Sequence, residues 1–159
     1  MKVEHPEPAR LSPADFLAVI THTPLVSIDL VLRNSAGAIL LGRRVNEPAK
    51  GKWFVPGGRI YKDETLEQAF ARISQHELGQ PHTLGSARLL GVYTHRYLTN
   101  ALLAPGVTTH YVVLAYELQD AGGSVDAMAQ HSEARWFTRA QADADVHEHV
   151  LPYFPAPSS

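Results

Sequence analysis

The sequence contains no cysteine among its 159 residues. Disulfide bonds and thiolate metal sites are therefore excluded, and cysteine usage says nothing about the redox compartment of the protein. The sequence also has no large excess of positive or negative charge, because 14 Lys and Arg residues against 16 Asp and Glu residues give a formal net charge of −2. This balance lacks the basic bias of a general nucleic-acid-binding protein, and we expect no nucleic-acid partner.

Long apolar runs are absent as well. No stretch approaches the roughly 20 apolar residues of a membrane-spanning helix, and the polar start "MKVEHPEPAR" lacks the apolar stretch of a signal peptide. We therefore expect a cytoplasmic protein with no membrane partner. The length fits one domain with a core of its own, so residues 1–159 are predicted to form a single domain whose ends, 1–10 and 155–159, are flexible.

Strand and helix patterns alternate along the chain and predict an α/β fold. Helices are expected at 11–23, with Ser12 as the cap, and at 65–78, starting at Asp63 or Glu64 and ending at Gly79. Thr138 is expected to cap a final helical segment. Segments of β-branched and apolar residues predict five strands, of which the first two form a hairpin: 25–32, 38–44, 87–97, 108–118 and 134–138. Hairpins mixed with crossovers favour a mixed sheet packed between helices.

Two further segments are predicted to be irregular. Residues 45–58 contain two prolines and three glycines, which favours a loop without a regular element. Residues 98–107 are also expected to form a loop, at a pocket or at a subunit contact. His147 and His149 are expected at the surface of a polar segment near the end of the chain. Trp53 and Phe54 are expected mainly in the core.

One helix and the loop before it carry chemically suggestive residues at unusual spacing. Gly58 is followed by Glu64, Arg72, Glu77 and Gly79, which gives G-x5-E-x7-R with an acid and a glycine behind it. A main-chain carbonyl at a glycine pair and a helix carboxylate are hard oxygen ligands that suit Mg²⁺ or Mn²⁺, and the arginine can hold a carboxylate in place. A surface ion pair on an amphipathic helix would explain the E-x7-R pair alone, but not the whole pattern.

This pattern resembles the box of the Nudix hydrolases, G-x5-E-x7-R-E-U-x-E-E-x-G-U, where U is a bulky apolar residue. Ile73 and His76 stand where that family has two glutamates. The GDP-mannose mannosyl hydrolases share this departure and resemble the chain from about Phe16 to Phe137, including "WFVPGGR", "ELG" and "QHSEARWFT". The resemblance implies a Nudix-type α/β/α sandwich with a mixed sheet and a homodimer. It also implies Mg²⁺-dependent hydrolysis of a GDP-sugar, GDP-mannose or also GDP-glucose, to GDP and free sugar.

The resemblance also assigns the metal site and the base. One Mg²⁺, with Mn²⁺ as the other option, is expected per active site, bound by the Gly58 carbonyl, Glu77 and Gln130. His131 matches the general base of the branch, and a histidine suits that role near neutral pH. Water would then attack the sugar C1 with inversion, and a second metal ion to activate water on phosphorus is not needed. Without the resemblance, Gln130 and His131 would be interpreted as part of a polar surface loop.

Further residues transfer to the substrate site in the same way. Asp29 is implied in catalysis near the sugar, although in a strand it could equally face solvent. Arg44 and Arg59 are implied in catalysis and in binding the diphosphate, a role that suits the forked donors of arginine. The residues alone do not separate Arg44 from its neighbour at position 43. His95 and Tyr97 are implied in substrate binding.

Two other functions compete with this interpretation. An ordinary Nudix pyrophosphohydrolase would cleave a nucleotide sugar at phosphorus, but the departures at Ile73 and His76 weaken it. A non-catalytic Nudix module would bind a nucleotide without cleaving it. The presence of Glu77, Gln130, His131 and both arginines argues against a module that only binds.

Overall fold

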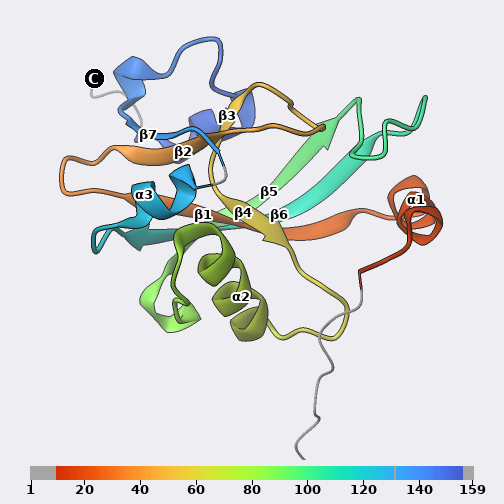
Figure 1. The fold of residues 1–159 in the computed structure, drawn as a ribbon, viewed down its shortest axis with the longest axis horizontal. Coiled ribbons are helices and arrows are strands. Elements are labelled where there is room, and N and C mark those ends of the chain that lie inside the picture. The colour runs from red at the N-terminus through yellow and green to blue at the C-terminus, as the bar shows by residue number, and fades with distance from the viewer. Residues whose placement is uncertain (1–9, 131, 156–159) are drawn as a thin grey trace, which may run out of the picture.

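Strand β1 (Leu25–Arg33) runs through the middle of the sheet and is buried along nearly its whole length. The computed structural model describes residues 10–130 and 132–155. Within these residues seven strands form one mixed sheet, in which five lie in the order β3-β2-β1-β6-β5, while β4 pairs with β1 and β7 with β2 (Figure 1). β1 is parallel to β6 and antiparallel to β2 and β4. The other strands are β2 (Ile39–Arg43), β3 (Trp53–Phe54), β4 (Gly57–Arg59), β5 (Arg88–Tyr97), β6 (Thr109–Gln119) and β7 (Ala134–Phe137).

The two faces of β1 contribute to two different cores. Ile28, Leu30 and Leu32 point to one face and pack with α2 (Leu66–Leu78) and α3 (Ser124–Ala129). Val31, on the other face, packs with the C-terminal segment that holds the short 3-10 helices η2 (Arg139–Gln141) and η3 (Glu148–Tyr153). This alternation follows from the period of two along a strand, and it gives the predicted α/β/α sandwich.

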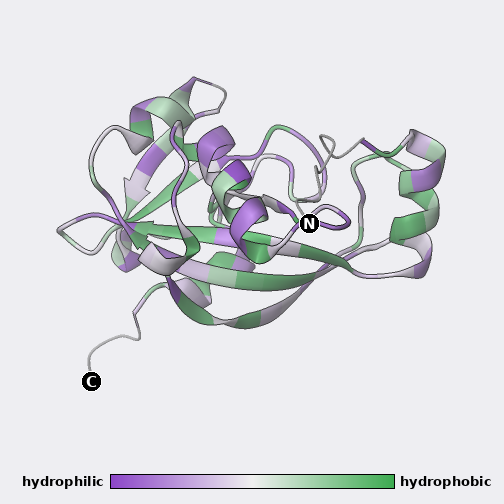
Figure 2. Ribbon diagram, turned by 90° about the horizontal axis from the view of Figure 1, so that it is seen from below, coloured by the Kyte–Doolittle hydropathy of each residue, from purple (hydrophilic) through white to green (hydrophobic). Residues whose placement is uncertain are grey.

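The hydropathy pattern agrees with this layering. In Figure 2 the strands of the sheet are largely green, and purple segments gather in the loops and on the outer sides of helices. Helix α1 (Pro13–His22) lies at the edge of the molecule, capped by Ser12, whose Oγ accepts a hydrogen bond from the Asp15 amide at 3.2 Å. In the part of the chain described, no helix is long and apolar enough to cross a membrane.

Helix α2 ends as predicted but begins at Leu66, one residue later than expected. Gly79 closes it in the left-handed conformation at φ +83°, which glycine adopts without strain. The N-cap is Thr65, which forms a capping box with Gln68, and not Asp63 or Glu64. Glu64 is unavailable as a cap because its carboxylate binds Arg72 and the Tyr61 amide.

Three other expectations about elements need correction. Residues 45–58 are not wholly irregular, because they contain β3 and the start of β4, each too short to show a pattern of its own. Helix α3 follows the Gly122-Gly123 break and was not expected. The segment after Thr138 is helical, as predicted, but consists of 3-10 turns rather than an α-helix. Of the ends predicted to be flexible, residues 1–9 and 156–159 lie outside the described part.

Strand β4 approaches β1 so closely that one residue must lack a side chain. Gly57 pairs with Asp29 and Gly58 with Ile28. A Cβ placed on Gly57 would collide with the Ile28 carbonyl oxygen and would lie 3.0 Å from Asp29 Oδ1. A Cβ on Gly58 would lie 3.1 Å from Ile73 of α2. The glycine pair therefore lets β4 lie directly on β1, with α2 against it.

We expect Gly57→Ala to destabilise the protein by about 2 kcal/mol, because the new methyl group meets backbone that cannot rotate away. Gly85→Ala is the matched control, because a Cβ there meets nothing within 4 Å. Chemical denaturation of both variants measures the free energy of unfolding. An equal effect at the two positions would show that the close approach of β4 to β1 is not required.

Candidate active site

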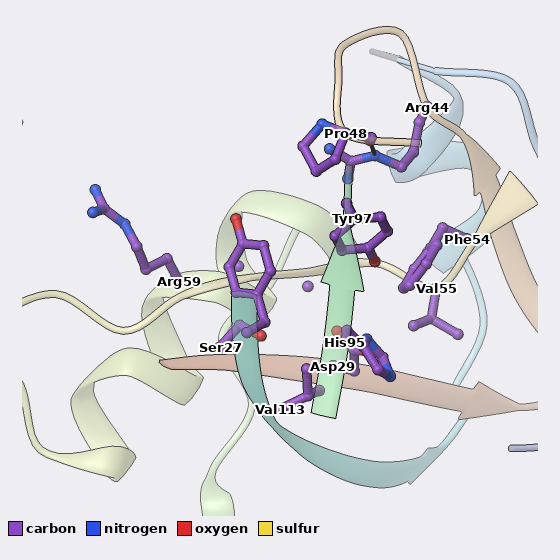
Figure 3. Close-up of a pocket in the computed structure, with 13 residues that line it drawn as sticks. Ser27, Asp29, Arg44, Pro48, Phe54, Val55, Arg59, His95, Tyr97 and Val113 are labelled. Carbon is purple, nitrogen blue, oxygen red and sulfur yellow. Dashed lines mark hydrogen bonds between the residues drawn. The ribbon is translucent and has the colours of Figure 1, made fainter. Parts of the chain in front are cut away.

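Six of the residues proposed for the site line one cavity, which we call the Asp29 cavity. They come from β1, β4, β5 and the segment after β2: Asp29, Arg44, Gly58, Arg59, His95 and Tyr97. Figure 3 shows Asp29 and His95 close to Val113, with Tyr97 above them beneath Arg44 and Pro48. The cavity has a volume of about 100 Å³, which is room for a small polar group together with water.

Asp29 is buried and does not face solvent, with 7% of its surface exposed. Its Oδ2 accepts a hydrogen bond from the Tyr153 hydroxyl at 2.7 Å. Burial raises the pKa of Asp29 from 3.8 to about 7, although the Tyr153 hydrogen bond and the Arg44 charge both favour the ionised carboxylate. A carboxyl group that titrates near neutral pH inside a cavity is typical of a functional site.

His95 belongs to a cluster of imidazole and phenol rings at the wall of the Asp29 cavity. Its ring stacks on His149 at 4.2 Å between centroids, and His147 lies 4.5 Å from His149. Tyr97 contacts both His147 and His149. His147 and His149, predicted at the surface, are half-buried, because the C-terminal segment holds their rings against β5.

Two imidazoles of this cluster, His95 and His147, are held in the neutral form. Burial, together with the neighbouring His149 and His147, lowers the pKa of His95 to about 4. Burial also lowers the pKa of His147 to about 4, with His149 adding to the effect. Neutral rings can stack without charge repulsion, and each can donate one hydrogen bond and accept one.

The two arginines lie on opposite sides of the Asp29 cavity (Figure 3). Arg44 donates from Nε to the Pro48 carbonyl at 2.7 Å, which holds its side chain at the rim. The guanidinium of Arg59 packs against the rings of Phe16 and Tyr61, at 5.1 and 5.3 Å from their centroids. Arg43, the competitor of Arg44, does not line this cavity; it is 44% exposed and faces Glu133.

A second cavity adjoins the first, and we call it the Glu77 cavity. Glu77 of α2 and Ser132 line it together with Arg44 and Gly57, which also line the Asp29 cavity. Gln130 is the exposed C-cap of α3 and is not among the lining residues, although Met128 and Ser132 on either side of it are. His131, the predicted general base, lies outside the described residues.

Oxygen donors of several kinds line the Glu77 cavity. Among residues 10–130 and 132–155, no group of three or more His, Asp or Glu side chains could hold a metal ion. The Glu77 carboxylate is accompanied instead by a hydroxyl group at Ser132 and by the main chain at Gly57. Such a mixed set of oxygen donors fits Mg²⁺ that takes its remaining ligands from substrate phosphates and water.

The two departures from the box have different structural consequences. Ile73 is 2% exposed and packs under Gly58, so an apolar group fills the place of a box glutamate. His76 is 74% exposed, and its Nδ1 lies 3.4 Å from Glu77 Oε1. The remaining part of the box keeps its architecture, because Arg72 binds both oxygens of Glu64 at 2.8 Å and also the Arg59 carbonyl.

A comparison with known families decides the identity of this fold. The NUDIX domain family matches residues 23–155. The chain belongs to the Nudix hydrolase family. Nudix hydrolases generally use divalent metal ions such as Mg²⁺, in accord with the oxygen donors of the Glu77 cavity.

Individual relatives support this assignment. The low-salt glycan biosynthesis protein Agl8 of Haloferax volcanii is 40% identical over 129 residues, which cover 80% of each chain. An ADP-ribose pyrophosphatase of Methanocaldococcus jannaschii is 31% identical over 116 residues, 72% of this chain and 62% of that protein. The crystal structure of a MutT NUDIX hydrolase from Burkholderia pseudomallei matches with a TM-score of 0.62 and 28% identity, covering 80% of this chain and 93% of that one. The predicted fold and family are confirmed.

Some residues of the site gave no clear signal in the sequence. Tyr153, His147 and His149 are far from the box in sequence, and only the folding of the C-terminal segment brings them to Asp29 and His95. The one hint was the dense run "DVHEHVLPYF", whose histidines and aromatic residues are unusual in a solvated end.

Asp29→Asn is expected to stabilise the protein increasingly as pH rises. The native pKa of Asp29 lies above the ordinary value of 3.8, so the native state retains a proton that the unfolded chain loses, and stability falls between about pH 4 and pH 7. The variant removes this loss. We expect its stability relative to the parent to increase by roughly 2 kcal/mol between pH 5 and pH 8.

Denaturant unfolding at the two pH values measures this difference, and the same change at the exposed Asp126 is the control. A relative stability of Asp29→Asn that does not change with pH would contradict the raised pKa of the buried carboxyl group.

Proposed function

We propose that this Nudix hydrolase cleaves a GDP-sugar, with GDP-mannose as the leading substrate and GDP-glucose as the second, to GDP and free sugar. The observation that carries the proposal is the division of the site into two joined cavities. A buried carboxylate and two arginines line one, and Glu77 lines the other. The glycan-related name of the Haloferax volcanii relative supports a nucleotide-sugar substrate.

The arginines favour departure of the diphosphate. Arg44 lines both cavities and Arg59 lines the Asp29 cavity, so a diphosphate bound at their junction would be within the reach of permanent positive charge. Negative charge grows on the diphosphate as its bond to the sugar C1 breaks, and fixed cations stabilise that charge without reorganising. Glu77 would hold Mg²⁺, with the Gly58 carbonyl and Gln130 as the further ligands that the resemblance implies, and the ion would supply more positive charge at the diphosphate.

The Asp29 cavity suits the sugar. The C1 carbon gains positive charge as the bond to the diphosphate breaks, and an ionised Asp29 at that point would stabilise it. His131 would take the proton of the attacking water as general base, so that water adds at C1 and the configuration inverts. The neutral His95 and the Tyr97 hydroxyl offer hydrogen bonds to sugar hydroxyl groups in the same cavity.

The loss of the box glutamates supports attack at carbon. Ile73 is buried in the apolar core, so its position offers no oxygen ligand for a further metal ion that would activate water on phosphorus. The second candidate, cleavage at phosphorus, is favoured by the likeness to the pyrophosphatase of Methanocaldococcus jannaschii. The homodimer stays a prediction from the resemblance.

Hydrolysis of GDP-mannose with Mg²⁺ in ¹⁸O-labelled water distinguishes the two reactions. We expect the label in mannose and none in GDP, because water adds to C1 and the bond from C1 to oxygen breaks. Mass spectrometry of the products measures this. Label in GMP or in mannose 1-phosphate would show attack at phosphorus, and binding of GDP-mannose without any product would favour a non-catalytic module.

His131→Gln is expected to lower kcat by about 100-fold, because glutamine cannot accept the proton of the attacking water. His22→Gln, the same change at an exposed histidine in α1, is the control. Steady-state kinetics with GDP-mannose, together with thermal unfolding of both variants, measures the effect. Turnover that survives in His131→Gln would remove this residue from the mechanism.

A further inference from the structure

Tyr153 connects the end of the chain to the catalytic carboxylate. It is the last residue of η3, it is 2% exposed, and its hydroxyl donates to Asp29 Oδ2 at 2.7 Å across 124 positions of sequence. Among the described residues, this is the one hydrogen bond to the Asp29 carboxylate. No motif of the Nudix box includes this tyrosine.

The phenol of Tyr153 is fixed from several directions. Arg33 donates from Nη2 to the Tyr153 carbonyl at 2.6 Å, and its Nε lies 3.3 Å from Oε2 of Glu117. The Tyr93 ring meets the Tyr153 ring edge-on, with 5.3 Å between centroids. Arg33 and Asp29 are four residues apart on β1 and therefore point to the same face of the sheet. The strand that carries Asp29 thus also anchors the main chain of Tyr153.

The hydrogen bond leaves one carboxylate oxygen for the substrate. Burial raises the pKa of Tyr153, and the nearby Asp29 raises it further, so the phenol keeps its proton and acts as the donor. Oδ2 of Asp29 accepts the hydrogen bond from the Tyr153 hydroxyl. Oδ1 lies on the side of Gly57, which lines the same cavity. A carboxylate with one oxygen tied in this way has a defined orientation toward the cavity.

We propose that Tyr153 is a positioning residue of the active site, which through its hydroxyl fixes the Asp29 carboxylate with Oδ1 toward the sugar-binding cavity. This proposal rests on the function proposed above for Asp29. The C-terminal segment is then part of the catalytic apparatus and does more than cover the sheet. It supplies the group that orients Asp29 and also the imidazoles that pack on His95.

Asp29 is surrounded by titratable or charged groups from every element packed on it. The charge of Arg44 favours the ionised form of Asp29. His95 and His147 stay neutral at pH 7, and the raised pKa values of Tyr97, Tyr111 and Tyr153 keep these phenols protonated. These groups come from β4, β5, β6, the segment after β2 and the C-terminal segment: Arg44, Arg59, His95, Tyr97, Tyr111, His147, His149 and Tyr153.

Kinetics of Tyr153→Phe test the proposal. We expect kcat with GDP-mannose to fall about tenfold with little change in KM, because the variant loses a charge-assisted hydrogen bond but no contact to substrate. The acidic limb of the pH profile should move to higher pH, because the lost hydrogen bond favoured the ionised carboxylate. Tyr93→Phe removes a hydroxyl from the ring beside Tyr153 and is the matched control, expected to leave both quantities unchanged.

Two further measurements separate positioning from a structural effect. In the Asp29→Asn background, Tyr153→Phe should cause no additional loss of kcat, because the tyrosine acts through Asp29. A ¹³C NMR titration of the Asp29 carboxyl carbon, without substrate, should give a higher pKa in Tyr153→Phe than in Tyr93→Phe. This titration decides the proposal even if the protein does not cleave GDP-mannose.

Equal Asp29 pKa values in the parent, Tyr153→Phe and Tyr93→Phe would overturn the proposal. So would a loss of kcat in Tyr153→Phe that recurs undiminished in the Asp29→Asn background, because it would show that the tyrosine acts only on the fold. A shifted carboxyl titration without turnover of GDP-mannose would support the positioning role of Tyr153 and contradict the proposed substrate instead.

Discussion

The close pairing of β4 with β1 is the constraint on which the site depends. Gly57 lies opposite Asp29 and Gly58 opposite Ile28, and a side chain at Gly57 would collide with the backbone of β1. Because this contact is so short, the carboxylate on β1 and the main chain before α2 line one cavity. Ile73 of α2 packs directly beneath Gly58, so the same contact fixes the helix that carries Glu77. Elements from both layers of the sandwich thereby meet at one place.

A second consequence concerns the burial of charge in the middle of the sheet. β1 is covered on both faces, and an unpaired carboxylate there would be costly. Asp29 is compensated by the Tyr153 hydroxyl and by the charge of Arg44, yet its pKa remains raised to about 7. His95 and His147 remain neutral for the same reason, since burial disfavours their protonated form. The cavity therefore combines one carboxyl group near its titration point with neutral hydrogen-bonding rings.

The box of the family is divided between a retained framework and an altered metal site. The framework is the bidentate ion pair of Arg72 with Glu64. Arg72 also donates to the Arg59 carbonyl and so connects α2 to the loop before it. The alteration is at Ile73, which has become part of the core, and at His76, which has become exposed. Glu77 remains at the second cavity. A helix can lose metal ligands in this way without loss of fold because its apolar stripe, and not its acids, packs on the sheet.

The sequence by itself determined the elements with strong local patterns and the family. The apolar stripe of residues 66–78, the αL cap at Gly79 and the β-branched, apolar run of 25–32 each depend on neighbours a few residues away, so they could be predicted without a structure. Only the tertiary structure decided that β3 and β4 are strands, because two or three residues carry no period and gain their hydrogen bonds from distant partners. It also decided that Tyr153 contacts Asp29 and that His149 stacks on His95, since the contact of Tyr153 with Asp29 spans most of the chain. Such long-range contacts follow from how the two layers close over the sheet, and no local pattern encodes them.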